Sequence, residues 1–152
     1  MTTARTYTSR RANIVNALAE KLKDINGAGA FLSDVQNNVH PFLKFWDEVD
    51  QFPAVHLNAG AETREYQAGG YKDRFLSVTI RCYVQDEEDA TEALNVLMED
   101  IETVVEENSR LEYADSQNNT FSTQQITIVS INTDEGVLEP LGVGEIDIEV
   151  RY

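Results

Sequence analysis

Two stretches of strict alternation between apolar and polar side chains constrain the fold of this chain most. The apolar set of the first stretch, residues 74–85, consists of Leu76, Val78, Ile80, Cys82 and Val84. In the second, residues 143–152, the apolar set Ile146, Ile148, Val150 and Tyr152 alternates with Glu145, Asp147, Glu149 and Arg151. Successive side chains of a strand point to opposite faces, so each stretch predicts a strand with one face on a core and one polar face.

Other segments add strands to this sheet. Residues 53–58 predict a strand that begins at Pro53 and that Gly60 ends. Residues 62–67 and 74–85 predict the two arms of a hairpin, because Ala68-Gly69-Gly70 supplies a permissive turn. Residues 125–133 predict a further strand, and residues 31–35 a short one. Gly142-Val143-Gly144 precedes the last strand and is interpreted as a turn.

Two segments predict helices. Residues 8–26 carry one apolar stripe, with Thr8 or Ser9 as the N-cap and Gly27 as the terminating residue. Residues 89–108 begin with the capping box Asp89-x-x-Glu92 and carry a broader apolar stripe. The element order predicts an α+β fold: a mostly antiparallel β-sheet with two α-helices packed on one face and an extended β-hairpin. The 152 residues suit a single domain over 1–152, with residues 1–9 as a basic N-terminal arm.

Charge is abundant and unevenly distributed. The chain has 27 acids and 12 Lys or Arg residues, a net charge of −15. Residues 1–23 hold five bases and one acid, a net of +4, and the other 129 residues hold 26 acids and seven bases, a net of −19. This excess disfavours tight binding of nucleic acid or of an anionic membrane. An acidic surface suits either solubility or a passage through which DNA slides without sticking.

No enzyme or cofactor chemistry emerges from the motifs. His40 and His56 have no ligand partner at helical spacing, and the single cysteine, Cys82, lies on the inward face of its strand. Nucleophile-elbow and phosphate-loop motifs are absent. Asp86-Glu87-Glu88-Asp89 lacks the spacing of a calcium loop, which favours a solvated helix lead-in over weak divalent binding. We therefore expect no catalytic, cofactor or metal site.

Aromatic residues offer candidate interaction sites. Phe42, Phe45, Trp46 and Phe52 form a dense group that we interpret as core or core-edge, with a subunit interface as the alternative. Phe42–Trp46 predicts a short helical turn or a plug over the core. Tyr66, Tyr71 and Lys72 flank the predicted hairpin turn and suggest an interaction arm. No apolar run approaches the roughly 18 residues that span a bilayer, and the N-terminus lacks a signal-peptide core, so we expect a protein of the reducing cytoplasm or of a particle assembled there.

The whole pattern resembles a known family. Its points are the helix around Arg11–Leu18, the strand entry Phe52-Pro53-Ala54-Val55 followed by Gly60-x-Glu62, the polar hairpin, the strand Phe75–Val84, and a helix containing Asp100-Ile101-Glu102. The chain resembles the tail terminator proteins of long-tailed bacteriophages, the lambda U-like family, in the order of these segments, in its length and in its acidity. The resemblance is best over residues 10–110.

The resemblance implies a structural virion protein rather than an enzyme. It implies a hexameric ring that caps the tail tube, stops polymerisation of the major tail tube protein and joins the head-tail connector, with DNA passing through its lumen. Such a protein is placed at the head-proximal end of the tail, and in the host cytoplasm during assembly. The rival interpretations are another neck or head-completion ring, such as a connector adaptor or stopper, and an acidic small-ligand or metal-binding domain.

Two groups of residues are then the candidate sites. We expect the subunit or tube interface to include basic and aromatic residues of the arm and the hairpin: Arg5, Arg10, Arg11, Trp46, Tyr66, Tyr71, Lys72 and Arg74. We expect the lumen or an exposed acidic face to include Glu145, Asp147 and Glu149.

Overall fold

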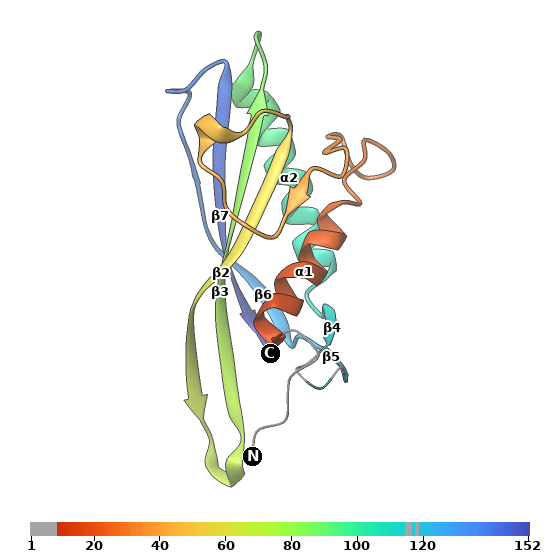
Figure 1. Cartoon of the computed structure of the whole chain (residues 1–152), viewed down its shortest axis with the longest axis vertical. Helices are drawn as coiled ribbons and strands as arrows, with labels where there is room; N and C mark the ends of the chain where they lie inside the picture. The colour runs from red at the N-terminus through yellow and green to blue at the C-terminus, as the bar shows by residue number, and fades with distance from the viewer. Residues whose placement is uncertain (1–8, 115–116, 118) are drawn as a thin grey trace.

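A long, twisted sheet runs the length of the molecule (Figure 1). The computed structural model describes residues 9–114, 117 and 119–152. The strands, in their order across the sheet, are β1 (Val39–His40), β2 (Ala54–Tyr66), β3 (Lys72–Gln85), β7 (Leu141–Arg151) and β6 (Gln125–Thr133). Only β1 and β2 pair in parallel, and every other neighbouring pair is antiparallel.

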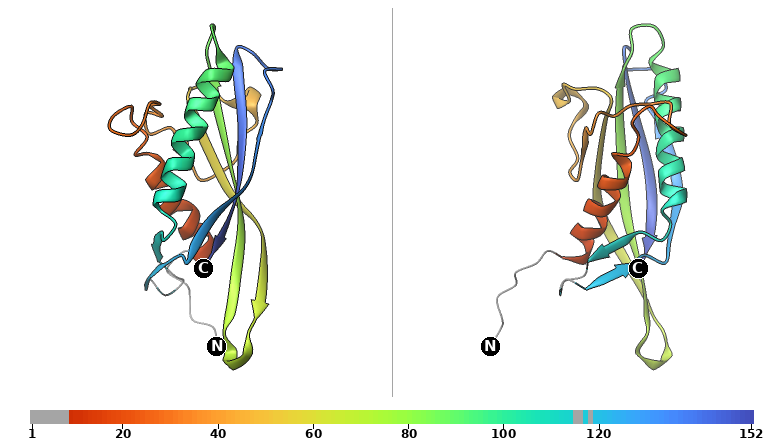
Figure 2. Two further views of the ribbon diagram at one scale, coloured as in Figure 1. Left: turned by 180° about the vertical axis from the view of Figure 1, so that it is seen from behind. Right: turned by 90° about the vertical axis from the view of Figure 1, so that its right-hand side faces the viewer.

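Both helices, α1 (Arg10–Leu22) and α2 (Ala90–Glu107), pack on one face of this sheet (Figure 2). The apolar residues of β3 and β7 point at them, as the alternation predicts, and each of the three β7 residues Ile146, Ile148 and Val150 is at most 1% exposed. The helices contribute Leu18, Leu97 and other buried residues to the same apolar cluster. The predicted α+β class is therefore confirmed. We call the opposite side of the sheet the open face.

The helix starts follow the predicted caps. Ser9 Oγ accepts the N–H of Ala12 at 3.2 Å, and the Asp89 carboxylate accepts the N–H of Glu92 at 3.0 Å. The predicted end of the first helix is wrong, because α1 stops at Leu22 with Lys23 as its cap. Gly27, with φ +77°, instead lies in the loop after the helix.

Two glycines that the sequence analysis interprets as a turn lie inside β7. A Cβ on Gly142 would come within 2.8 Å of Val84 Cγ2, and one on Gly144 within 2.8 Å of Met98 Sδ. The turn prediction is therefore wrong. These positions are glycine because α2 crosses β7 so closely that no side chain fits between them.

The hairpin is longer than predicted. β2 does not end at Gly60 but continues to Tyr66, with a register irregularity between Ala59 and Glu62. A 3₁₀ turn over Ala68–Gly70 joins it to β3. Because β7 pairs with β3 only from Phe75 onward, the hairpin tip projects beyond the sheet (Figure 1).

Two segments without a clear sequence pattern complete the fold. β4 (Glu112–Ala114) and β5 (Thr120–Ser122) form a separate two-stranded sheet beside the start of α1. Residues 31–35 do not form the predicted strand and contribute only an isolated bridge between Asn26 and Asp34.

Candidate interaction surfaces

An acidic row runs along β7 on the open face. Glu145, Asp147 and Glu149 alternate with the core residues and are each partly exposed. Asp147 accepts hydrogen bonds from Thr79 Oγ1 of β3 at 3.2 Å and from Ser130 Oγ of β6 at 3.1 Å. The structure thus brings the three predicted acids together on one surface, with Asp147 held between its neighbours.

One cation partly balances this row. Arg81 of β3 pairs with Glu145 at 3.1 Å. Burial opposes the charged form of Arg81, but hydrogen bonds to Glu145 and Tyr83 outweigh it and raise its pKa. Asp73 of β3 and Arg151 of β7 form a second ion pair on this face, at 2.8 Å. The face between these strands thus carries four carboxylates against two guanidiniums, and so remains acidic.

The basic residues at the start of α1 have partners within the chain. Arg10 donates to Tyr113 Oη at 2.7 Å, and its guanidinium lies 4.9 Å from the centre of the Tyr152 ring. Arg11 donates to the carbonyl of Gly60 on β2. Arg5 lies outside the described residues. Arg10 therefore ties α1 to the β4–β5 sheet and to the C-terminal end of the chain.

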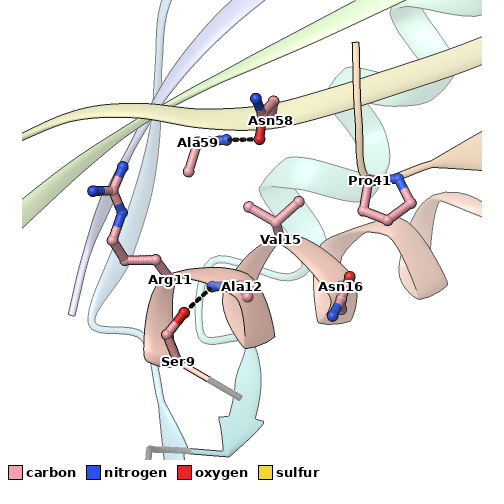
Figure 3. Close-up of a pocket in the computed structure, with 8 residues that line it drawn as sticks. All are labelled: Ser9, Arg11, Ala12, Val15, Asn16, Pro41, Asn58 and Ala59. Carbon is pink, nitrogen blue, oxygen red and sulfur yellow. Dashed lines mark hydrogen bonds between the residues drawn. The ribbon is translucent and has the colours of Figure 1, made fainter.

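A shallow cleft lies beside Arg11. It separates α1 from β2, has a volume of about 310 Å³, and is bounded by Pro41 at one end (Figure 3). Asn16 of α1 and Asn58 of β2 supply polar groups along its walls. Among the described residues its lining is mixed, and Arg11 supplies the charged group there.

The hairpin has an anchored base and an exposed tip. At the base Tyr152 donates to Glu62, and Arg74 lies 5.5 Å from the Tyr152 ring centre. Burial opposes the ionisation of Glu62, but hydrogen bonds from Tyr152 and Arg64 outweigh it and lower the pKa of Glu62.

At the tip, Tyr66 is 73% exposed and Tyr71 75% exposed, and Lys72 is exposed beside them. Two aromatic rings of this size held in water on a projecting hairpin are typical of a contact surface.

The dense aromatic group lies on a segment that we call the strap, residues 41–52. The strap wraps from the β2 edge onto the open face and includes a 3₁₀ turn over Trp46–Glu48 (Figure 1). It covers Tyr83 and His56, two open-face side chains that are at most 2% exposed. The predicted plug thus exists, but it covers the open face rather than the helix-packed core.

Side chains of the sheet hold the strap in place. His56 Nδ1 lies 3.0 Å from the carbonyl of Phe42, and Tyr83 donates to the carbonyl of Lys44. Burial is the main cause that lowers the pKa of His56. The aromatic residues of the strap itself are only partly covered: Phe42 is 50% exposed, Phe45 66% and Trp46 39%. A place in the core is therefore wrong for these three, whereas the core-edge alternative fits Phe42, whose ring stacks on His40 at 5.3 Å, and the partly buried Phe52.

One buried acid escaped the sequence analysis. The Asp100 carboxylate, 4% exposed, accepts the N–H groups of Leu32 and Ser33, the latter at 2.7 Å. It fixes the loop after α1 against α2. The available signal was its spacing, since Asp100 lies three residues after Leu97 and four before Val104, on the apolar stripe of its helix.

The cysteine and the acidic run singled out in the sequence have structural roles. Cys82 is fully buried, as predicted, and burial raises the pKa of its thiol to about 12. Asp86 accepts the N–H groups of Glu88 and Asp89, so the acidic run is a helix lead-in. In the described ranges, no three His, Cys, Asp or Glu side chains gather closely enough to hold a metal ion. None of the helices in the described part of the chain has the length and apolarity that crossing a bilayer requires.

Two comparisons with known proteins identify one family, and a third shows the fold. A family model described as Bacteriophage Tail Tube Terminator Protein matches residues 8–152. The tail tube terminator protein p142 of Escherichia phage T5 is 33% identical over 149 residues, which covers 93% of this chain and 92% of that protein. A chain in the virion of a native gene transfer agent particle shares the fold, with a TM-score of 0.62 at 8% identity over 95% of this chain and 98% of that one. This chain therefore belongs to the bacteriophage tail tube terminator family.

Proposed function

We propose that copies of this chain form a ring, a hexamer by resemblance, that caps the finished tail tube and stops its polymerisation. The ring also offers the surface that the head-tail connector binds, and DNA passes through its lumen. Family membership over nearly the whole chain carries this proposal. The role is structural and places the protein at the head-proximal end of the virion tail, after assembly in the host cytoplasm.

The acidic row supports the lumen part of the proposal. A conduit for DNA must not retain phosphate groups, and carboxylates repel them. Glu145, Asp147 and Glu149 form a continuous acidic row on the face of the sheet opposite α1 and α2. We assign this face to the lumen, with the helices on the outside of the ring.

The exposed aromatic and basic residues support the proposed contacts with a neighbouring subunit and with the tail tube. The hairpin tip, with Tyr66, Tyr71 and Lys72, projects beyond the sheet and is suited to reach a neighbouring subunit or the tube. Arg74 at the hairpin base extends this surface, and Trp46, on the strap near the other end of β2, offers a separate contact. Arg10 and Arg11 at the start of α1, together with Arg5 of the preceding basic segment, supply positive charge to acidic neighbours, and Arg10 also anchors the helix.

Tube assembly in vitro tests the function. Purified chain is added to polymerising tail tube protein, and tube length and end caps are measured by electron microscopy, with particle mass by light scattering. We expect a mass that is a multiple of 17.1 kDa and tubes that stop growing. A chain that stays monomeric with growing tubes, and leaves tube length unchanged, would refute the proposal.

Charge neutralisation tests the lumen. The triple variant Glu145→Gln, Asp147→Asn, Glu149→Gln should slow DNA ejection from complemented particles and make isolated rings retain DNA. The matched control removes three charges from α2 instead: Glu99→Gln, Glu106→Gln, Glu107→Gln. Equal effects of the two triples would show that total charge, and not this face, governs DNA passage.

A further inference from the structure

The outer edge of β6 has no partner strand in the described part of the chain. β6 ends the sheet, with β7 as its one neighbour there. The segment after α2 binds the backbone at the beginning of β6, where Ser109 Oγ accepts the N–H of Ile126 at 3.0 Å. The remainder, from Thr127 to Thr133, is a long free edge. Such an edge presents unpaired backbone donors and acceptors and is a template for pairing with another strand.

The composition of this edge is unusual for this chain. The nine residues of β6 include no charged side chain, although 26% of the chain is charged. They lie within the longest uncharged run of the sequence, from Ser116 to Thr133. Soluble proteins protect long edges with charges, above all Lys, or with proline. The protection found here is one irregularity between Ile128 and Ser130, and it leaves Val129 64% exposed and Ile131 40% exposed.

Charge identifies another copy of the chain as the occupant. Two copies that each carry a net charge of −15 repel one another over most of their surfaces. The uncharged edge is the surface on which a copy approaches without that repulsion. A strand added there gains backbone hydrogen bonds along its length.

The opposite edge of the sheet supplies a fitting strand. β1 pairs with β2 at Val55 and His56, the Asn58 side chain accepts the N–H of Ala59, and Arg11 binds the Gly60 carbonyl. Within the described part of the chain, the free stretch of the β2 edge is therefore Glu62–Tyr66, toward the hairpin tip. β2 runs opposite to β6, because three antiparallel pairings separate them. A copy rotated about an axis along the strands therefore presents its β2 antiparallel to β6, which continues the pairing pattern of the sheet.

The two free edges are staggered along the strands. Asn58 of β2 pairs with Thr79, Thr79 with Asp147, and Asp147 with Ser130 of β6, so the free edge of β6 is level with the occupied part of β2, whereas Glu62 is level with Ile126. A neighbour must therefore be displaced along the strands for its free β2 edge to reach β6, as the stagger of tilted strands in a closed barrel requires. A head-to-tail contact of this kind closes into a ring when the rotation between copies closes.

We propose that β6 of each copy pairs with the free edge of β2 in the next copy, so that the sheets of the ring join edge to edge. This inference rests on the proposed ring and identifies the surface that builds it. It also places the acidic row of every copy on one continuous face.

A charge placed on the edge tests this inference. In the double variant Val129→Lys, Ile131→Lys both changes are at exposed positions, so the fold should survive, as thermal unfolding can verify. The matched control is Val137→Lys, at a valine that is 82% exposed in the loop after β6. We expect the double variant to run near 17.1 kDa by light scattering at concentrations where wild type and control are oligomeric, and to cap tubes at least tenfold less well.

Hydrogen exchange gives a second measurement on the unmodified chain. Amides between Thr127 and Thr133 should be slowed in the assembled ring relative to the monomeric double variant. A folded double variant with wild-type mass would overturn the edge contact while leaving the ring intact. A wild type that is monomeric both alone and with tubes would overturn the ring, and the edge contact with it.

Discussion

The two faces of the central sheet are built from alternate residues of the same strands, yet they differ in burial and in charge. On the helix-covered face, Ile80 and Ile146 are fully buried. One residue away, on the open face, Arg81 and Glu145 form a partly exposed ion pair. The buried set is explained by stability alone, because burial of apolar surface is the main favourable term in folding. The acids of the open face serve no core, so their charge is informative about function.

The largest expected effect comes from the covered face. Ile146→Ala should lower the free energy of unfolding by about 2–5 kcal/mol, because it removes buried methyl groups and leaves a cavity. Its neighbour Glu145→Ala should cost about 0–1 kcal/mol, since its pair with Arg81 is screened by solvent. Urea unfolding of the two variants measures both. Similar losses would mean that the two faces do not differ as described.

The sequence predicts much of the fold because the relevant signals are local. The period of two in residues 74–85 and 143–152 identifies the core face of two strands without knowledge of their partners. The caps at Ser9 and Asp89 place both helix starts. Gly60 shows where local signals fail. Glycine weakens a strand, but β2 continues past Gly60 because the residues before and after it pair with β3.

The interaction surfaces were less predictable because they depend on contacts between distant segments. Tyr83 lies in the polar set of its strand, and only the strap from residues 41–52 buries it. Arg10 is held by the rings of Tyr113 and Tyr152, which lie more than one hundred residues away. Such clusters leave no periodic pattern in the sequence.

A second prediction tests how closely α2 covers β7. Gly144→Ala places a Cβ about 3 Å from Met98 Sδ, Cys82 Sγ and Leu94 Cδ1, at 2.8, 3.0 and 3.1 Å. Overpacking of a close-packed core costs about 1–3 kcal/mol. The control Gly60→Ala meets only the Ser77 carbonyl, at 3.9 Å, and should change stability little. Thermal unfolding compares them, and a neutral Gly144→Ala would show that the helix moves away easily.

The smallest expected effect concerns the part of the open face beneath the strap. Because the carbonyl of Phe42 only accepts, His56 Nδ1 carries the hydrogen of their contact, and a second proton must enter at Nε2 of a side chain that is 2% exposed. Burial therefore lowers the pKa of His56 below the ordinary 6.5. The unfolded chain takes up this proton as the pH falls through about 6.5, before the folded chain does. The stability contributed by neutral His56 is present above that pH and is lost below it.

The resulting prediction is measured between pH 7.5 and pH 5.5, above the range in which Glu62, whose pKa is also lowered, begins to protonate. Wild type should lose stability in urea as the pH falls, and His56→Gln should lose less. Trp46 is the sole tryptophan and lies on the strap, so quenching of its fluorescence by acrylamide reports strap opening directly. Tyr83→Phe is the matched control, because it removes the hydrogen bond to the Lys44 carbonyl and leaves His56 in place. This variant should expose Trp46 more than wild type at every pH. Its stability should keep the wild-type pH dependence. A pH dependence that is unchanged in His56→Gln would show that a group other than His56 carries it, and would refute the role of His56 beneath the strap.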